Sequence, residues 1–94
     1  MTPTVQLETN DKNGYFYIEV DGKLAAKMTF VYAGNYKIII DHTEVNEAHN
    51  GKGFGKQMVA QAVVFAREKN LKIIPLCPFA KKVFEKTPEY QDVL

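Results

Sequence analysis

The residues best suited to chemistry in this 94-residue chain are three glycines at alternate positions, Gly51, Gly53 and Gly55. The apolar stretch 38–40 precedes them, and an amphipathic stretch typical of a helix follows them directly. Unpaired main-chain N–H groups converge at a helix N-terminus, and the helix dipole adds positive potential there. Because glycine has no Cβ, an anion can approach this backbone closely. The loop predicts a site for a phosphorylated ligand, and a tight strand-to-helix turn without a ligand is the alternative.

Two well-known phosphate-binding loops fit this segment poorly. The Gly-Lys-Ser/Thr ending of a P-loop is missing, because Gln57 follows Gly55-Lys56. The glycine spacing also differs from that of a dinucleotide-binding loop, and the strands before it are predicted to be antiparallel. Lys52 and Lys56 are candidates to add positive charge, although solvated surface lysines are equally compatible with the sequence.

Cys77, the one cysteine of the chain, directly precedes Pro78, and proline is favoured in the first turn of a helix. The positive end of a helix lowers the pKa of a nearby thiol. Three roles are open for this residue: a small buried apolar side chain, a residue that lines the site, or a nucleophile that becomes acylated. We favour the second role. A single cysteine excludes an internal disulfide.

Several titratable side chains lie near the end of the strand that leads to the glycine loop. Strand alternation predicts that His42 and Glu44 share one face and that Asp41 and Thr43 share the other. His42 and Glu44 are candidate catalytic residues, and the sequence leaves open which face meets a substrate. His49 lies in the loop as a surface residue or an acid/base group, and we favour the surface. No pair of these residues has metal-ligand spacing with a supporting third residue, so no metal site is predicted.

Alternating apolar residues predict a meander of four antiparallel strands before the glycine loop. We expect these strands over residues 5–9, 15–20, 24–32 and 36–45. An Asp21-Gly22 pair marks the hairpin between the second and third strands. A three-residue loop, 21–23, unites the apolar faces and predicts a bulged turn with its glycine in the left-handed conformation. That register pairs Val20 with Leu24, Ile18 with Ala26 and Phe16 with Met28.

The second half of the chain predicts a helix over residues 54–69, a fifth strand over 72–76 and a second helix over 78–86. We expect the long helix to face the sheet through apolar residues at helical spacing and to stop at Asn70. These apolar residues are Met58, Val59, Ala62, Phe65 and Ala66. The strand–helix–strand connection favours parallel pairing of the fourth and fifth strands, which gives an α+β fold with a mixed sheet.

Pro75 lies near the end of the predicted fifth strand and has no N–H to donate. It can weaken pairing so that the fourth and fifth strands splay apart, or it can simply end the strand.

Length and composition predict one globular domain over residues 1–94, with 46% apolar and 24% charged residues. A net charge of +1 gives no support to nonspecific binding of nucleic acid or membranes. The chain has no apolar run long enough to span a bilayer, and its N-terminus lacks the features of a signal peptide. We therefore expect a cytoplasmic location.

The element order and the Gly-x-Gly-x-Gly run resemble the GNAT superfamily of acetyl-CoA-dependent N-acetyltransferases. Its pyrophosphate motif, Q/R-x-x-G-x-G/A, is similar to residues 50–55, except that Asn50 stands where Arg or Gln is usual. A small single-domain subgroup is similar over most of the chain. The blocks that carry this likeness are Thr43-Glu44-Val45, Pro75-Leu76-Cys77-Pro78-Phe79 and Pro88-Glu89-Tyr90. The subgroup usually has His before Pro-Glu-Tyr, whereas this chain has Thr87, so any role of that histidine is absent or replaced.

The resemblance implies that acetyl-CoA is the cofactor. It assigns the pyrophosphate to the main-chain amides of Gly51, Lys52, Gly53, Phe54, Gly55 and Lys56. It also implies that the backbone of Glu44, Val45 and Asn46 pairs with the pantetheine arm, with one amide polarising the thioester carbonyl. Asn50 is shorter than Arg and uncharged, so it would contribute less to phosphate binding, and Lys52 and Lys56 are candidates to compensate.

The family generally transfers the acetyl group directly to a primary amine, which implies the same reaction here with an acceptor still open: a small amine, a peptide or a protein. The alternatives are a noncatalytic acyl-CoA-binding module and a small interaction domain whose glycine loop holds no ligand. Full-length GNAT domains carry two helices between their early strands, and here residues 10–14 form only a loop. The acceptor site is therefore expected to be open or completed by a second subunit. The oligomeric state is not predicted.

Overall fold

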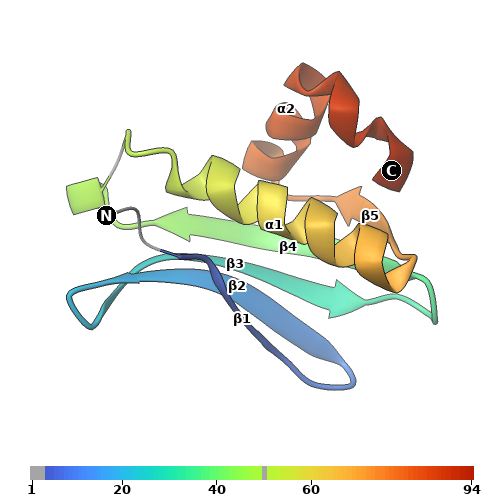
Figure 1. Cartoon of the computed structure of the whole chain (residues 1–94), viewed down its shortest axis with the longest axis horizontal. Helices are drawn as coiled ribbons and strands as arrows, with labels where there is room; N and C mark the ends of the chain where they lie inside the picture. Colours follow the sequence, from blue (N-terminus) through green and yellow to red (C-terminus); the bar gives the residue numbers. More distant parts are fainter. Residues whose placement is uncertain (1–3, 50) are drawn as a thin grey trace.

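The computed structural model describes residues 4–49 and 51–94. A five-stranded sheet has the order β1-β2-β3-β4-β5, and two helices lie on one of its faces (Figure 1). Strands β1 to β4 are antiparallel, whereas β4 and β5 are parallel. The predicted α+β fold with a mixed sheet is confirmed. The strands are β1 (Gln6–Thr9), β2 (Asn13–Val20), β3 (Lys23–Tyr32), β4 (Lys37–Val45) and β5 (Lys72–Pro75). The helices are α1 (Phe54–Lys69) and α2 (Pro78–Lys86), with short 3-10 helices η1 (Glu47–His49) and η2 (Pro88–Val93).

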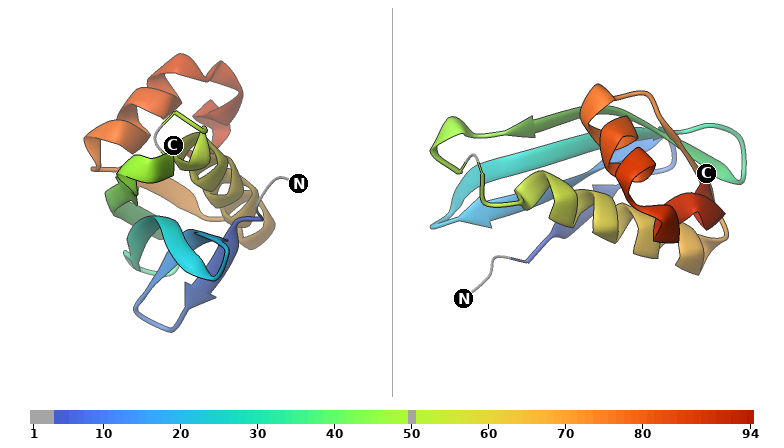
Figure 2. Two further views of the ribbon diagram at one scale, coloured as in Figure 1. Left: turned by 90° about the vertical axis from the view of Figure 1, so that its left-hand side faces the viewer. Right: turned by 90° about the horizontal axis from the view of Figure 1, so that it is seen from above.

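Helix α1 lies along the sheet, and α2 packs beside it (Figure 2). The predicted bounds of both helices are confirmed. Asn70 ends α1 in the left-handed conformation (φ 56°), and its N–H donates to the main-chain oxygens of Ala66 and Arg67. Because α2 also packs against α1, the buried stripe of α1 is wider than the sequence pattern indicated and includes Val63. The half-buried Phe65 packs against the rings of Phe16 and Phe30.

The predicted three-residue turn between β2 and β3 is wrong. Val20 pairs with Lys23, so the loop has only two residues, and both Asp21 (φ 54°) and Gly22 (φ 77°) adopt the left-handed conformation of a type I′ turn. The extra residue lies inside β3 instead, because Glu19 pairs with Leu24 while Ile18 pairs with Ala26. Leu24 therefore leaves the core and is 49% exposed. The predicted pairing of Phe16 with Met28 and the left-handed glycine are confirmed.

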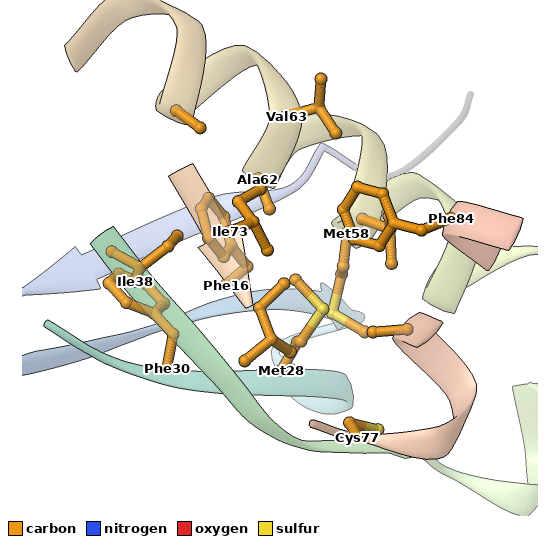
Figure 3. Packing of buried hydrophobic residues seen from close by; sticks show 14 of the residues in the cluster. Phe16, Met28, Phe30, Ile38, Met58, Ala62, Val63, Ile73, Cys77 and Phe84 are labelled. Atoms are coloured by element: carbon orange, nitrogen blue, oxygen red, sulfur yellow. The ribbon is translucent and has the colours of Figure 1, made fainter. Parts of the chain in front are cut away.

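The core lies between the sheet and the two helices (Figure 3). Every fully buried large apolar side chain contributes roughly 1.5–3 kcal/mol relative to an exposed one. Cys77 lies at the edge of this cluster, on the connection from β5 to α2, and is 5% exposed. The largest side chains with almost no exposed surface are Phe30, Phe84, Ile18, Met28, Ile38, Ile40, Met58, Ile73, Val59 and Val63.

The C-terminal segment after α2 is held against α1 by charge. Arg67 of α1 donates to both carboxylate oxygens of Asp92, at 3.0 Å and 2.8 Å, and to the main-chain oxygen of Glu89. Lys72 of β5 donates to the main-chain oxygen of Asp92. The 3-10 helix η2 was not predicted, because its one apolar residue with a buried side chain, Val93, gives no periodic signal.

Candidate functional site

The glycine loop forms an open concave turn at the start of α1. Gly51 (φ 85°) and Gly53 (φ 78°) both adopt the left-handed conformation, which side chains with a Cβ rarely adopt. Gly53 is the N-cap residue of α1, and no side chain of the described residues caps this end. The Lys52 N–H, one of the amides predicted to bind the pyrophosphate, donates instead to the His49 oxygen at 3.3 Å. In α1 the first bonded N–H is that of Gln57, which donates to the Gly53 oxygen at 3.0 Å. The N–H groups of residues 54–56 therefore have no partner among residues 4–49 and 51–94.

These free N–H groups border a cavity of about 290 Å³. A Cβ added to Gly51 or Gly53 would meet no atom within 4 Å, so both glycines face open space. The first turn of α1 holds no acidic residue, and Lys56 adds a cation to the positive end of the helix. The cavity therefore suits an anion. Its lining residues are Val45, His49, Gly51, Gly53, Phe54, Gly55, Lys56 and Phe79.

Lys52 and His49 interact beside this cavity. The Lys52 ammonium donates to His49 Nδ1 at 2.9 Å, and the His49 ring packs against that of Phe54 with centroids 5.6 Å apart. His49 is half-buried rather than fully at the surface, where the sequence placed it.

Strands β4 and β5 separate next to the cavity. Their pairing ends with Ile40 opposite Pro75, while β4 continues to Val45. The N–H groups of Leu76 and Cys77 both donate to the Ile40 oxygen, at 3.0 Å and 3.1 Å, as the chain turns away. The predicted fifth strand is therefore one residue too long, because it ends at Pro75 and not at Leu76. In the described part of the chain, no strand pairs with the last five residues of β4 on this side.

A bulge in β4 changes which side chains face the helices. Thr29 pairs with His42 whereas Phe30 pairs with Ile40, so Asp41 is the extra residue. Beyond the bulge, Thr43 pairs with the buried Met28 and lies on the helix side of the sheet.

The prediction that the side chains of Asp41 and Thr43 share one face of β4 is therefore wrong. Asp41 lies on the outer face, where the Thr29 hydroxyl donates to its carboxylate at 2.6 Å. His42 and Glu44 do share a face, as predicted, and it is this outer face, because Glu44 pairs with Lys27 and the histidine with Thr29.

The same register decides which main-chain groups of β4 face the gap left by β5. The Asn46 N–H donates to the Ala25 oxygen at 2.7 Å, so residue 46 directs its main chain toward β3. Because main-chain groups alternate in direction along a strand, those of Val45 and Thr43 point toward the gap. Of the three predicted pantetheine-binding residues, Val45 thus presents its main chain there, whereas Glu44 and Asn46 present theirs to β3.

Cys77 lies at the closed end of the gap, where it is the N-cap residue of α2. Its thiol donates to Thr43 Oγ1, with the two atoms 3.3 Å apart. Burial by itself raises the pKa of this thiol, but hydrogen bonds from Thr43 and from main-chain N–H groups outweigh that effect and hold the pKa below its usual value. These N–H groups belong to Ala80, Phe79 and Thr43.

His42 and Glu44 form a hydrogen-bonded pair on the outer face, with Nε2 and Oε1 2.8 Å apart. Both side chains are largely in solvent, with exposed fractions of 63% and 71%. Neither helix covers this face of the sheet (Figure 1). The pair lies where it can exchange a proton with a group that approaches from the outer face.

Like His49, Phe79 lines the cavity without having been assigned to it from the sequence. Its ring lies against the backbone of Gly55, where a Cβ would meet the ring atoms Cζ and Cε1 at 2.5 Å and 2.6 Å. The third glycine of the motif is thus required by the close approach of α2 to α1. The signal available in the sequence was the position of Phe79 next to Cys77-Pro78.

The structure therefore brings most predicted cofactor-binding residues together. Gly51, Gly53, Phe54, Gly55, Lys56 and Val45 line one cavity, with Lys52 at its rim and Cys77 beyond it in the gap. His42 and Glu44 lie on the other face of β4. Asn50 lies outside the described residues. Within those residues, no group of three or more His, Cys, Asp or Glu side chains is arranged to hold a metal ion.

The sequence from residue 15 to residue 93 matches the family model described as GCN5-related N-acetyltransferase. The chain belongs to this family. The sheet with separated β4 and β5 and the glycine loop at the start of α1 are thus the GNAT fold of a small member. Membership of the family supports acetyl transfer as the general activity.

Two solved GNAT structures resemble this one closely. A GCN5-like protein from Staphylococcus aureus is 39% identical, with a TM-score of 0.73 over 94% of this chain and 85% of its own. An acetyltransferase from Bacillus subtilis, solved in complex with CoA, is 18% identical with a TM-score of 0.70 over 90% of this chain and 74% of its own. At that identity the second likeness concerns the fold alone.

The chain is also similar to "Protein NATD1" of Gallus gallus, with 28% identity over 89% of this chain and 77% of the relative. It spans only 62% of the length of a ribosomal-protein-alanine N-acetyltransferase from Brucella melitensis biovar Abortus 2308, which has a TM-score of 0.70 and 23% identity. In the part of this chain that the structure describes, neither helix is long and apolar enough to cross a membrane.

Proposed function

We propose that this GNAT protein transfers the acetyl group of acetyl-CoA directly to a primary amine in a ternary complex, in the cytoplasm. The observation that carries the proposal is the set of free N–H groups at the start of α1, next to the gap between β4 and β5. A diphosphate fits those donors and the open space beside Gly51 and Gly53. The gap offers unpaired strand groups to the amides of a pantetheine arm.

When bound, acetyl-CoA supplies a thioester whose carbonyl carbon forms a bond to the amine nitrogen as its bond to sulfur breaks. Negative charge grows on the carbonyl oxygen, and the main-chain N–H of Val45, which points toward the gap, is the proposed donor that stabilises it. The ammonium form of the acceptor must first lose a proton. His42, paired with Glu44, is the proposed base for an acceptor that approaches from the outer face.

Cys77 is proposed to line the thioester site rather than to become acylated. Its Sγ is engaged with Thr43 and with N–H groups of α2, which fixes its position and lowers its nucleophilicity along with its pKa. Direct transfer also needs only one displacement at the carbonyl carbon. The acyl-enzyme route would require the acetyl group to be passed on from a side chain that is 5% exposed.

The test of CoA binding uses a pair of glycine variants with matched backbone strain. Gly53→Ala places a Cβ in the cradle at φ 78°, whereas Gly34→Ala places one in the distant turn between β3 and β4 at φ 74°, and both face open space. Each substitution is expected to cost roughly 1–2 kcal/mol of stability. Only Gly53→Ala should weaken CoA binding, by at least about tenfold, measured by calorimetry on the folded proteins. Equal weakening in both variants would place the diphosphate elsewhere.

Acetyl-CoA turnover with polyamines, amino acids and peptides then tests catalysis. A noncatalytic acyl-CoA-binding module is the second candidate, and it is favoured by the outer face, where the His42–Glu44 pair is largely exposed to solvent and neither helix covers the sheet. CoA binding without turnover of any amine would support the module. Absence of CoA-dependent shifts in the amide NMR signals of residues 51–56 would leave only a small interaction domain.

A further inference from the structure

Direct transfer of the acetyl group leaves the sulfur of CoA in need of a proton. As the bond between the carbonyl carbon and the sulfur breaks, its electron pair stays on the sulfur, which must end the reaction as a thiol. The proposed base, His42, lies on the outer face of the sheet with 63% of its side chain exposed, and its task is to remove protons. A proton donor on the gap side of β4 is therefore a separate requirement of the reaction.

The titratable side chains around the cradle differ in how close they lie to the gap. His49 and Lys56 line the cradle cavity, where the diphosphate is expected. Tyr90 lines a separate cavity to which no residue of β4 contributes. Cys77, in contrast, contacts β4 directly, because its thiol donates to Thr43 Oγ1 with the two atoms 3.3 Å apart. Of these side chains, the cysteine is therefore the one best placed to meet a thioester in the gap.

The gap brings the Cys77 thiol close to the proposed position of the thioester. Val45, the proposed donor to the carbonyl oxygen, is two residues from Thr43, which corresponds to roughly 7 Å along a strand. The main chains of both residues point toward the gap. An acetyl thioester has a comparable length, so a thioester that accepts the Val45 N–H can also reach Cys77 beside Thr43.

The surroundings of Cys77 suit the thiolate that remains after a proton has been given away. The residue caps the N-terminus of α2, where the helix dipole favours negative charge. Burial alone raises the pKa of the thiol, whereas hydrogen bonds from Thr43 and from the N–H groups of Ala80 and Phe79 lower it and prevail. The Thr43 hydroxyl can accept from the thiol and, after rotation, donate to the thiolate. No charged side chain of the described residues contributes to this shift.

We propose that Cys77 is the general acid of the reaction and gives its proton to the sulfur of CoA as the bond from that sulfur to the carbonyl carbon breaks. This role rests on the proposed function, because it completes the same transfer. The Sγ–H bond of Cys77 breaks, an S–H bond forms on CoA, and the cysteine is left as a thiolate. The nitrogen of the new amide releases one proton to solvent, and solvent returns one to Cys77. The acetyl group is never bonded to the cysteine.

The experiment measures kcat of the full chain with acetyl-CoA and one primary amine for the wild type, Cys77→Ser and Cys77→Ala. Serine has nearly the size of cysteine and the same hydrogen-bonding groups, but its hydroxyl holds the proton far more tightly than a thiol does. Both variants should therefore lower kcat by about 10²-fold while keeping the affinity for CoA, measured by calorimetry. A residue that only lines the site would be replaced well by serine, and kcat would then stay close to the wild-type value.

The pH dependence of kcat gives a second readout. In the wild type, kcat should fall as the pH rises through the pKa of the Cys77 thiol, because the thiolate has no proton to give. This fall should be absent in Cys77→Ser. In Thr43→Val it should move to higher pH, because the loss of the hydrogen bond raises the pKa of the thiol.

The outcomes separate this inference from the proposed function. Wild-type kcat in Cys77→Ser overturns the inference and leaves direct transfer in place, and so does a fall in kcat at the same alkaline pH in that variant. A loss of CoA affinity with kcat unchanged does the same. Acetylated Cys77, detected by mass spectrometry during turnover, overturns both the inference and direct transfer. Binding of CoA without acetylation of any amine also overturns both and supports the noncatalytic module.

Discussion

The contact between Gly55 and Phe79 predicts how Gly55→Ala changes the free energy of unfolding. The direction of that change should depend on whether the Phe79 ring is present. Gly55 is a helical residue without a left-handed φ, so alanine is compatible with its backbone. Its added Cβ would nevertheless lie 2.5 Å from Cζ of Phe79, closer than real Cβ atoms approach other heavy atoms. The Phe79 ring is 40% exposed and must move outward. Gly55→Ala therefore tests whether α1 and α2 are held together at this glycine.

Two effects of known size oppose each other in this variant. Alanine is favoured over glycine in a helix by up to about 1 kcal/mol. Forcing an extra carbon into a packed contact costs typically about 1–3 kcal/mol. In the wild-type background, Gly55→Ala should therefore lower the free energy of unfolding by up to about 2 kcal/mol. In a Phe79→Ala background the clash is gone, and the same change should raise the free energy of unfolding by up to about 1 kcal/mol.

Urea unfolding of the four proteins in this cycle measures both values. The control background is Leu76→Ala, which removes an exposed side chain of the same segment that does not touch Gly55. There Gly55→Ala should have its wild-type effect within about 0.5 kcal/mol. The same effect of Gly55→Ala with and without the Phe79 ring would refute the conclusion that this glycine is required by helix packing.

Three further predictions follow from the site and its surroundings. Thr43→Val removes a hydrogen bond to Cys77, so the pKa of the thiol should rise, and the thiolate absorbance should appear at higher pH than in the wild type; an unchanged midpoint would contradict the assigned cause. The Arg67 guanidinium holds the pKa of Asp92 below its usual value, so this pair stabilises the fold at neutral pH and loses its contribution as the pH falls through that lowered pKa. Arg67→Gln should therefore make stability less sensitive to acid, and an unchanged acid-unfolding profile would show that the pair contributes nothing. His42→Gln should lower kcat by about 10²-fold without changing CoA affinity, whereas unchanged kcat at every pH would exclude this base.

The sequence was most informative where local signals agree. The start of α1 at Phe54 followed from the glycine loop, and its end followed from Asn70, which tolerates the left-handed conformation. The start of α2 at Pro78 followed from the place of proline in the first helical turn. The parallel pairing of β4 with β5 followed from the length of the connection between them. Each of these features is encoded within a few residues.

The parts that the sequence did not reveal depend on distant contacts. The position of Phe79 in the cradle depends on how closely α2 approaches Gly55, which no local pattern reports. The wrong prediction of a three-residue turn between β2 and β3 has a similar cause. Two arrangements bring the apolar side chains of these strands onto one face. Both shift the register by one residue, one in the turn and the other at a bulge within β3. The structure adopts the second, because Asp21-Gly22 suits a two-residue turn well.

The bulge at Asp41 has the largest consequence for the site. Ile40 is buried against the helices, so an unbroken strand would also turn His42 and Glu44 toward them and turn Thr43 outward. The extra residue reverses this order. It places the threonine hydroxyl beside Cys77 at 3.3 Å and leaves the histidine and its carboxylate partner in solvent. The hydrogen bond from Thr29 to Asp41 stabilises the bulge from the outer face. A single inserted residue thus separates the side chains that can line a thioester from those that can deprotonate an incoming amine.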